Sequence, residues 1–527
     1  MGGFVTTLEQ NHAINLSTMN QYTKIIAYAG AGKTSTIVLI AEQLVYQKKR
    51  GIYLAFNKAI SDEAGRKLPR GVDAKTFHSL AFQNVDRDIT RKLEHKFPGF
   101  FRQQYEKMAG FPASINITGD ASKIQSNGSD KSSFKLTTYK QYEIVKKTLD
   151  NFFRSDNLIP NQQQLEETID IVCQMVVYHD YKEIIVQLLM PIINKLWADY
   201  TDPNGSFRIS HDVYLKIYAL SKPIINYDFI LFDEAQDSDN LMLSILKEQK
   251  CQIIFVGDPY QQIYEWRGAV DAMKKFEGAE TYLTKSFRFG ERIAIPANFL
   301  LNYLKAPQPL QGNNQKKGEI DFKNNLPITD AILCRTNAGA ISMALDYVDK
   351  YPTKTTAILN VNITEIEELL KDLEYFYKDC TTGSHHPILK NFENYVELEL
   401  YCKNFPGDTN IAPTFRLYDK FGYSFLIDNL ERFKNINPKQ AETIVTTAHR
   451  AKGQEWNKVL LGDDFEGITY KVATKDKSPE LCSDGEARLL YVTVTRAKDV
   501  LQLGRIDDSF LRWLAKHAFK DNIEEAC

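Results

Sequence analysis

The chain lacks the features of a membrane protein, a disulfide-stapled scaffold or a strongly basic protein. No apolar run in its 527 residues approaches the ~18 needed to span a bilayer, and no signal-peptide pattern precedes the first motif. Its seven cysteines are odd in number and never form a C-x-x-C pair, which disfavours disulfides and structural zinc. The formal net charge is only -2, so any affinity for nucleic acid must come from a local groove.

One stretch, residues 25–36, has the composition of a phosphate-binding loop. It reads I-I-A-Y-A-G-A-G-K-T-S-T, an apolar strand followed by a glycine-rich turn and the start of an apolar helix. Glycines let backbone amides converge on phosphate oxygens, and the helix N-terminus adds a positive dipole end. Lys33 and Thr34 are placed to reach the terminal phosphates and Mg²⁺. The stretch predicts a nucleoside triphosphate site.

An acidic pair follows a second apolar segment. Residues 227–232 read Y-D-F-I-L-F and are followed by D-E-A-Q-D at 233–237. Behind a phosphate loop, Asp233 would hold Mg²⁺ and Glu234 would activate the water that attacks the γ-phosphate. A lone D-E-A-Q is often a solvated turn, and the loop upstream favours the catalytic interpretation.

Three segments contain residues suited to bases or adenine, each with an ordinary alternative. Gln10, just upstream of the loop, could read an adenine edge or be a polar helix residue. The segments A-F-N-K and T-F-H-S lie where strands of a parallel sheet would end. Phe56 and His78 within them could equally be a core aromatic and a structural histidine.

The segment after residues 251–258, another apolar strand, gathers glutamine, aromatics and arginine. It reads P-Y-Q-Q-I-Y-E-W-R-G-A from residue 259. Gln261 could sense a γ-phosphate, and Tyr264, Trp266 and Arg267 form the aromatic and cationic group that stacks on unpaired bases. Trp266 alone would more often be a core residue.

Taken in order, these motifs resemble the UvrD/Rep-like branch of superfamily 1 DNA helicases. Residues 283–288, 331–337, 446–456 and 488–498 look like further motifs of that branch. Within it, I-S-H-D-V-Y-L-K at 209–216 and G-D-P-Y-Q-Q-I-Y at 257–264 resemble the helicase part of the F-box DNA helicases, although we expect no F-box region ahead of Gln10. Departures occur at Ser35, Phe287, Gln454 and Trp456, which affects fine contacts rather than hydrolysis.

The resemblance implies an α/β fold with two RecA-like P-loop NTPase domains, parallel sheets flanked by helices, each carrying a mostly α-helical inserted accessory domain. The expected first motor domain is 1–84 with 224–284, interrupted by an insertion at 85–223. The expected second motor domain is 285–340 with 438–527, interrupted by a short insertion at 341–437. A histidine pair at 385–386 in that last insertion is expected to be a loop rather than a metal site.

The resemblance also implies ATP-driven movement along single-stranded DNA, 3′ to 5′, with strand separation, and a cofactor pair of ATP and Mg²⁺. The residues implied in catalysis are Lys33, Asp233, Glu234, Gln261, Arg288 and Arg496. Those implied in ATP binding are Gln10, Ala29, Gly30, Ala31, Gly32, Lys33, Thr34, Ser35, Phe287 and Glu455, with Thr34 and Asp233 holding the metal. Those implied in DNA binding are Phe56, Asn57, Thr76, His78, Tyr264, Trp266, Arg267 and Arg335.

Two other functions share these motifs. One is a translocase that strips proteins from DNA, and the other is the ATPase subunit of a defence complex, whose cleavage would need a partner nuclease because the sequence shows no nuclease motif. We therefore expect single-stranded DNA and single-strand/duplex junctions as substrates in repair, recombination or replication. A nuclease or a recombination factor is the expected class of protein partner. The expected location is cytoplasmic, or nucleoid-associated in a prokaryote.

Overall fold

The computed structural model describes residues 6–93, 106–118, 133–173, 182–265, 268–321, 329–378, 389, 392, 394–404, 411–465, 469–471, 480–481 and 483–504. The chain divides into two compact units. The first comprises Met1–Ile26, Thr34–Gly257 and Tyr264–Thr281, and the second comprises Ala27–Lys33, Asp258–Ile263 and Tyr282–Cys527. Two short turns, Ala27–Lys33 and Asp258–Ile263, thus belong to the second unit although the strands before them lie in the first.

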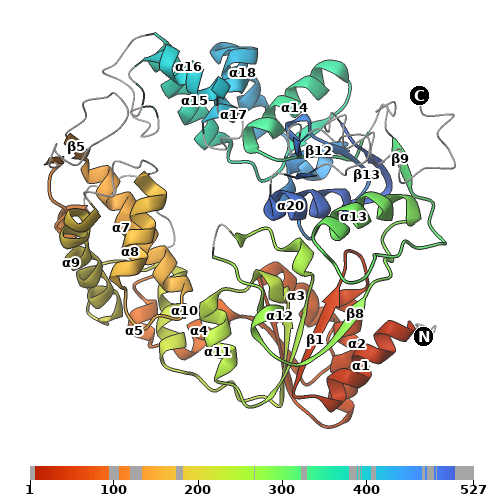
Figure 1. Ribbon diagram of the computed structural model, residues 1–527. Helices are drawn as coiled ribbons and strands as arrows, with labels where there is room; N and C mark the ends of the chain where they lie inside the picture. Colours follow the sequence, from red (N-terminus) through yellow and green to blue (C-terminus); the bar gives the residue numbers. More distant parts are fainter. Residues whose placement is uncertain are drawn as a thin grey trace. The chain divides into compact units, whose positions relative to one another are not determined.

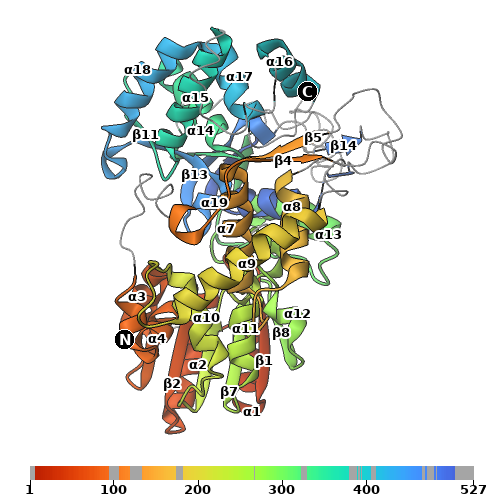
Figure 2. The same cartoon turned by 90° about the vertical axis from the view of Figure 1, so that its left-hand side faces the viewer.

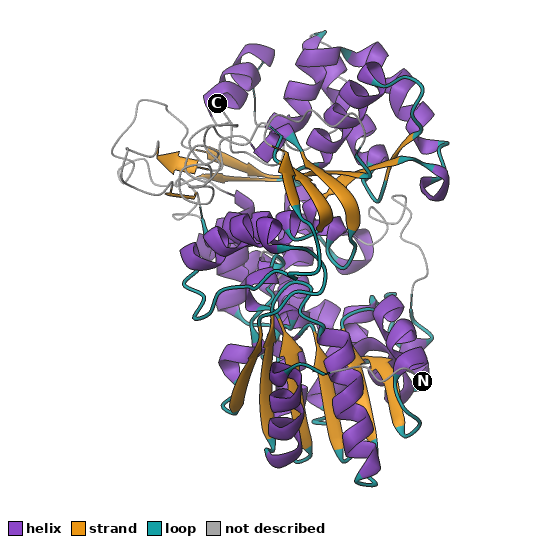
Figure 3. Ribbon diagram, turned by 90° about the vertical axis from the view of Figure 1, so that its right-hand side faces the viewer, coloured by secondary structure: helices purple, strands orange, loops and turns teal. Residues whose placement is uncertain are grey.

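The first unit is built on a six-stranded sheet with the order β3-β2-β6-β7-β1-β8. The pairs β3–β2, β2–β6, β6–β7 and β7–β1 are parallel, and Figure 3 shows these strands side by side with helices beside them. β2 and β6 are buried along their whole length, as expected of strands covered on both faces. The strands are β1 (Tyr22–Ala27), β2 (Gly51–Ala55), β3 (Val72–Thr76), β6 (Phe229–Asp233), β7 (Gln252–Gly257) and β8 (Ala279–Leu283).

Helices flank these strands in the sequence, and polar residues at the ends of two strands cap the helices that follow them. Asn57 accepts a hydrogen bond from the Ile60 amide at the start of α3, and Thr76 accepts one from the Ser79 amide at the start of α4. Such caps satisfy amides that have no partner within the helix. The helices are α1 (Leu8–Met19), α2 (Lys33–Tyr46), α3 (Lys58–Lys67), α4 (Phe77–Asn84), α11 (Asn240–Lys247) and α12 (Ala272–Lys275).

The chain between α4 and β6 forms a mostly helical insertion with one antiparallel hairpin, β4 with β5. Helices α7 to α10 lie side by side in both cartoon views (Figures 1 and 2). Phe152 and Trp197, whose ring centroids are 5.0 Å apart, belong to its core. The elements are α5 (Arg87–Thr90), β4 (Ile115–Thr118), β5 (Ser133–Leu136), α7 (Thr138–Arg154), α8 (Gln162–Cys173), α9 (Lys182–Thr201) and α10 (His211–Leu220).

A buried lysine ties α10 to the loop that follows α7. The Lys216 side chain is fully buried, and its Nζ donates to the carbonyl oxygens of Ser155 at 2.8 Å and Asn157 at 2.6 Å. The same Nζ lies 4.3 Å from the centroid of the Phe152 ring. Burial lowers the pKa of Lys216 to about 8. The loop is thus anchored by a cation that the folded state holds in a poorly solvated place.

The second unit contains another six-stranded sheet, with the order β11-β12-β10-β13-β16-β9. All five of its strand pairs are parallel. The strands are β9 (Glu319–Asp321), β10 (Ala331–Cys334), β11 (Thr356–Ile358), β12 (Thr443–Thr447), β13 (Trp456–Leu461) and β16 (Ala497–Gln502). The associated helices are α13 (Glu291–Tyr303), α14 (Asn337–Lys350), α19 (Ala448–Ala451) and α20 (Asp484–Val494), and a short antiparallel pair joins β14 (Thr469–Lys471) to β15 (Glu480–Leu481).

Four further helices of the second unit form one group that shares a hydrophobic core with α14 and the sheet (Figure 2). Leu370, Phe415 and Leu430 are buried in it together with Ile332 of β10. The helices are α15 (Ile363–Tyr377), α16 (Tyr395–Asn404), α17 (Ala412–Phe421) and α18 (Tyr423–Lys434). Because the core is continuous, this insertion is packed onto its sheet rather than tethered by a linker.

The predicted fold class is therefore confirmed: the protein is α/β, with two parallel six-stranded sheets flanked by helices. The residue boundaries of the four predicted parts remain a prediction. Within the part of the chain that the structure describes, no helix is both long and apolar enough to cross a membrane. The histidine pair at 385–386 lies outside the described residues.

Candidate nucleotide and DNA site

The acidic pair and the glycine-rich turn follow strands that end at the same edge of the first sheet. Val256 of β7 is in register with Ile25 of β1 on one side and with Asp233 of β6 on the other. Neighbouring strands are about 4.8 Å apart, so Asp233 lies roughly 10 Å from Ile25. The chain leaves β1 two residues later, at Ala27. Ligands of open parallel sheets bind at this carboxyl edge.

The turn itself has the backbone conformation of a phosphate-binding loop. Gly30 and Gly32 have φ angles of +73° and +77°, a region that side chains disfavour. Helix α2 begins at Lys33, and Thr34 and Ser35 are exposed in its first turn. Helix α2 thus begins at the residue where the phosphate-loop pattern expects a helix to begin, and phosphate binding there stays a prediction.

Gly30 is also closely packed. The Phe287 amide donates to the Gly30 carbonyl oxygen at 2.7 Å. A Cβ added at Gly30 would lie 2.6 Å from both Arg288 Cβ and Ser286 Oγ. Within the second unit, the loop and residues 286–288 are therefore fitted to each other with no room for a methyl group.

Gln10 has a structural role in addition to the one expected of it. Its side-chain Oε1 accepts a hydrogen bond from the Thr7 backbone amide at 3.0 Å. The Gln10 backbone amide donates to the Thr7 hydroxyl, and the two bonds form a capping box at the start of α1. Its Nε2 donates to the Thr36 hydroxyl in α2 at 3.2 Å. The glutamine is 1% exposed, so it joins α1 to the helix of the phosphate loop.

The acidic pair is held in place by a tyrosine that the sequence analysis did not single out. The buried Tyr53 hydroxyl donates to Asp233 Oδ2 at 2.6 Å, and the Glu234 amide donates to Oδ1 at 2.9 Å. Burial and the Asp233 charge raise the pKa of Tyr53, so the phenol keeps its proton. The two bonds fix the orientation of a carboxylate, which is the type of oxygen donor that Mg²⁺ prefers.

Glu234 has a strained backbone that its surroundings explain in part. Its φ of +53° and ψ of +40° are left-handed, which is uncommon outside glycine and is often found at functional sites. Its Oε2 accepts the Gln236 side-chain amide. On β7, a Cβ at Gly257 would lie 2.3 Å from Gln236 Oε1, so glycine is required there to accommodate Gln236.

Gln261 and Arg496 are hydrogen-bonded to each other within the second unit. Arg496 Nη2 donates to Gln261 Oε1 at 3.2 Å, and Gln261 Nε2 donates to Asp258 Oδ2 at 2.6 Å. The Gln261 carbonyl oxygen accepts Lys452 Nζ at 2.8 Å. Arg496 is only 2% exposed. The two residues expected to meet a γ-phosphate are therefore already adjacent.

The other predicted arginine, Arg288, contacts the motif that contains Arg496. Its Nε pairs with Glu455 Oε2 at 2.7 Å, and its Nη1 donates to the Thr495 carbonyl oxygen at 2.9 Å. Burial alone would raise the pKa of the Glu455 carboxyl, but the charge and hydrogen bond of Arg288 outweigh it and lower that pKa. Phe287 next to it is 38% exposed and available for stacking.

Two of the predicted DNA-contacting aromatics are brought together. The rings of Phe56 and Tyr264 are stacked, with centroids 6.0 Å apart and planes inclined by 10°. Phe56 is 39% exposed. Asn57 and Thr76 act as helix caps at the adjacent strand ends. Trp266 and Arg267 lie outside the described residues.

His78 is linked to the helical insertion through the Asp212 carboxylate, which also contacts Arg154. Its Nε2 lies 3.2 Å from Asp212 Oδ1, and Arg154 Nη2 lies 3.4 Å from Oδ2 of the same carboxylate. Burial would raise the pKa of Asp212, but the hydrogen bond with His78 and the Arg154 charge lower it. The His78 ring also meets Tyr214 edge-on at 6.2 Å. The expected DNA contact is thus oriented by α7 and α10.

Arg335 is engaged by an acidic partner in the structure. Its Nε and Nη2 bond the two carboxylate oxygens of Glu486 at 2.9 and 2.6 Å, a bidentate pair of partly exposed side chains. Its amide donates to Asp464 Oδ1. A DNA contact by this arginine would have to share or replace the bonds to Glu486.

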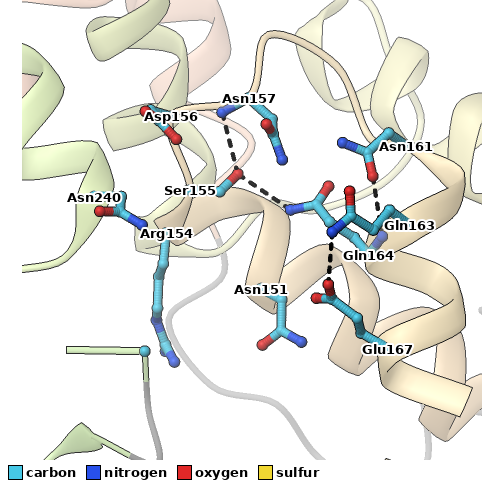
Figure 4. A pocket seen from close by; sticks show the side chains of 11 residues that line it. Asn151, Arg154, Ser155, Asp156, Asn157, Asn161, Gln163, Gln164, Glu167 and Asn240 are labelled. Carbon is cyan, nitrogen blue, oxygen red and sulfur yellow. Dashed lines mark hydrogen bonds between the residues drawn. The ribbon is translucent and has the colours of Figure 1, made fainter. Parts of the chain in front are cut away.

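A polar pocket of about 360 Å³ lies in the first unit and includes Arg154 in its lining (Figure 4). It is bounded by the end of α7, the start of α8 and two turns near α11 and α12. In Figure 4 the Gln164 amide reaches Ser155 Oγ, at 3.2 Å. Asn240 and Gly268 close another side. None of the predicted site residues lines it.

The residues that the sequence analysis missed are those that position others. Asp258 and Tyr491 lie inside motifs already recognised, and Tyr53 lies two residues before A-F-N-K. All three stand in or beside apolar runs where they would be taken for core. The one available signal was that a tyrosine or aspartate at a strand end or in a buried helix needs a polar partner. Across the described residues, no group of three or more His, Cys, Asp or Glu side chains forms a metal site. The oxygen donors Thr34 and Asp233 are nevertheless the type that Mg²⁺ prefers.

A glycine-rich turn between a buried strand and a helix, with an acidic pair two parallel strands away, is the arrangement of a P-loop nucleoside triphosphatase. The protein-family model described as the UvrD/REP helicase N-terminal domain matches residues 6–279, just over half of the chain. The chain therefore belongs to the UvrD/Rep family of helicases.

Named relatives agree with this assignment. The chain is 29% identical to F-box DNA helicase 1 of Gallus gallus, over 96% of this chain and 49% of the relative. It is 28% identical to F-box DNA helicase protein 1 of Schizosaccharomyces pombe, over 91% and 55% respectively. Gabija protein GajB of Bacillus cereus is 29% identical over 57% of this chain and 69% of its own length. The chain thus spans about half the length of the two F-box DNA helicases, and the resemblance inferred from the motifs is confirmed.

Proposed function

We propose that this protein is an ATP-dependent DNA helicase that moves 3′ to 5′ on single-stranded DNA and couples ATP hydrolysis to strand separation. Family membership supports the reaction class. The observation that carries the proposal is the register at Val256, which aligns the acidic pair and the strand of the phosphate loop at one sheet edge. Repair, recombination or replication is the proposed setting.

The nucleotide would bind through residues from both sequence halves. Lys33 would neutralise phosphate charge, and Thr34 with Asp233 would hold Mg²⁺, which neutralises developing charge on the phosphates. Glu234 would orient and deprotonate the attacking water. Arg288 and Arg496 would act as arginine fingers, a role worth ~10³-fold or more in rate in other nucleotidases. Adenine and ribose contacts are proposed for Gln10, Phe287 and Glu455.

DNA would bind through stacking and polar contacts at the strand ends. The stacked pair Phe56 and Tyr264 offers an exposed aromatic platform, which tolerates any base sequence. The remaining proposed DNA contacts are Asn57, Thr76, His78, Trp266, Arg267 and Arg335. Gln261, hydrogen-bonded to Arg496, would transmit the state of the γ-phosphate toward this surface.

Two alternatives remain. A translocase that strips proteins from DNA would use the same residues. An ATPase that works with a partner nuclease in a defence complex is the second alternative, and it would share the same motifs. A displacement assay on protein-coated DNA and a search for a co-purifying nuclease would distinguish these from an unwinding enzyme.

The decisive experiment compares unwinding of matched 3′-tailed and 5′-tailed duplexes with ATP and Mg²⁺. We expect unwinding of the 3′-tailed duplex, hydrolysis stimulated by single-stranded DNA, and loss of both in Lys33→Ala and Glu234→Gln. Unwinding of the 5′-tailed duplex alone would contradict the polarity. Hydrolysis that is equally fast with and without DNA would contradict the coupling.

A further inference from the structure

Four hydrogen bonds in the second unit join the phosphate loop to Arg496. The Ala29 amide donates to Tyr491 Oη at 3.2 Å, and Tyr491 Oη is bonded to Asp258 Oδ2 at 3.3 Å. Gln261 Nε2 donates to the same Oδ2, and Arg496 Nη2 donates to Gln261 Oε1. We call this series, Ala29–Tyr491–Asp258–Gln261–Arg496, the loop relay.

The direction of every bond in the loop relay is fixed by chemistry. A backbone amide only donates, so the single hydroxyl proton of Tyr491 must go to Asp258, which as a carboxylate only accepts. Gln261 must then turn its NH₂ toward Asp258 and its oxygen toward Arg496, because a guanidinium only donates. Each member therefore has one orientation that satisfies both neighbours.

The loop relay is also shielded from water. Tyr491 and Asp258 are fully buried, Arg496 is 2% exposed and Gln261 is 8% exposed. Burial and the nearby Asp258 charge raise the pKa of Tyr491 well above its ordinary value, so its hydroxyl remains a donor. In such a setting, removing one partner leaves the others without compensation from solvent.

We propose that Tyr491 is a positioning residue for ATP hydrolysis, setting the orientation of Gln261 and Arg496 relative to the phosphate loop through Asp258 and the Ala29 amide. This inference rests on the proposed function. Because Ala29 already donates to Tyr491, the hydroxyl acts through the loop backbone and not on the nucleotide. Loss of the hydroxyl should slow hydrolysis while ATP binding by Lys33 persists.

The test is Tyr491→Phe, which removes one oxygen atom, compared with Tyr347→Phe. Tyr347 of α14 is also buried, and its hydroxyl bonds the Thr329 amide at 3.4 Å and Thr443 Oγ1 at 3.3 Å, away from the loop relay. kcat and KM for ATP are measured with saturating single-stranded DNA, along with the thermal midpoint. One lost hydrogen bond corresponds to a kcat ratio of roughly 5- to 10-fold.

We expect Tyr491→Phe to lower kcat about 5- to 10-fold with KM for ATP within about twofold, on the scale of one hydrogen bond. Tyr347→Phe should lower only the thermal midpoint. In combination with Asp258→Asn, the loss should be no greater than that of the more severe single variant, as for members of one network. If Tyr491→Phe does not fold, Asp258→Asn alone should show the same fall in kcat at constant KM.

Three results would overturn the inference. They are wild-type kcat in Tyr491→Phe, equal effects of the two tyrosine variants on kcat, and additive losses in the double variant. The proposed function, and the inference with it, would instead be overturned if wild-type ATP hydrolysis were not stimulated by DNA and the Lys33→Ala variant still hydrolysed ATP at the wild-type rate. DNA stimulation of the wild type and the activity of Lys33→Ala thus test the proposed function, whereas the Tyr491 and Asp258 variants test the positioning role of Tyr491.

Discussion

Replacing Gly30 with alanine tests whether the phosphate loop is as tightly fitted as its geometry indicates. The new Cβ would meet Arg288 Cβ and Ser286 Oγ at 2.6 Å, and the residue would keep a φ of +73°. The left-handed backbone costs an L-residue about 1–2 kcal/mol. Forcing a methyl group into a packed site adds roughly 1–3 kcal/mol. We therefore expect Gly30→Ala to lose about 2–5 kcal/mol in all.

Gly422→Ala is the matched control. Gly422 lies between α17 and α18 in the same unit with a φ of +74°, and nothing lies within 4 Å of its Cβ position. Its ψ of 158° lies in a region that is almost exclusive to glycine, so Gly422→Ala reports a backbone strain at least as large as that of the left-handed region, without the contact. The measurement is calorimetric unfolding without nucleotide, where 1 kcal/mol moves the midpoint of a domain this size by roughly 2–4 °C.

The Gly30→Ala midpoint should fall further than the Gly422→Ala midpoint, because only Gly30→Ala adds the steric contact. Hydrolysis measured below the transition should also fall, since the added methyl group displaces Arg288 from its pairing with Glu455. Equal midpoints for the two variants would refute the reasoning. They would mean that the side chains near Gly30 move aside at no cost.

Three further predictions use other parts of the molecule. Tyr53→Phe, which removes the tyrosine hydrogen bond to Asp233 Oδ2, should raise the Mg²⁺ concentration for half-maximal hydrolysis about 5- to 10-fold, the scale of one lost hydrogen bond; an unchanged Mg²⁺ titration would contradict it. The pKa of Lys216 falls from 10.5 to about 8 on folding, so between these pH values the folded protein binds fewer protons than the unfolded protein. The stability of the wild type relative to Lys216→Met should therefore rise by roughly 2–3 kcal/mol from pH 8 to pH 10.5. Denaturation of both proteins at several pH values measures this difference, and a difference that does not change with pH would contradict the prediction. Phe56→Ala, which removes half of the stack with Tyr264, should raise the DNA concentration for half-maximal stimulation by about 5-fold or more without changing its salt dependence, because no charge is lost.

Local patterns predicted the elements whose signal lies in consecutive residues. The strand, turn and helix at 25–36, and the acidic pair after an apolar strand, follow from continuous apolar runs and from glycine, and both are found where expected. The two parallel sheets were implied by the resemblance to the UvrD/Rep-like helicases, and both are present. The hairpin of β4 and β5 was not predicted, since short polar strands have little hydrophobic pattern.

Long-range partners could not be predicted from such patterns. Tyr53 lies 180 residues from Asp233, and Tyr491 lies 233 residues from Asp258. In sequence each tyrosine stands in an apolar run and has the periodicity of a core residue. Its hydroxyl acquires a role only when the fold brings a carboxylate beside it. The pairing of Arg335 with Glu486 was unforeseen for the same reason.

The hydrogen bond between Arg496 and the neutral amide oxygen of Gln261 gives the proposed mechanism its energetic basis. Among the acceptors of the Arg496 guanidinium are the carbonyl oxygens of Val492 and Gln454, the Thr495 hydroxyl and Gln261 Oε1, and these four are uncharged. A phosphate oxygen is charged, and charge-assisted hydrogen bonds are roughly twice as strong as neutral ones. Exchanging Gln261 for a γ-phosphate would therefore favour the nucleotide. The bond of Lys452 to the Gln261 carbonyl oxygen would hold the main chain, so that only the amide turns. Replacement of Gln261 Oε1 by a γ-phosphate oxygen as the acceptor of Arg496 would thus both release the Gln261 side chain, which would sense the nucleotide, and stabilise the phosphate charge.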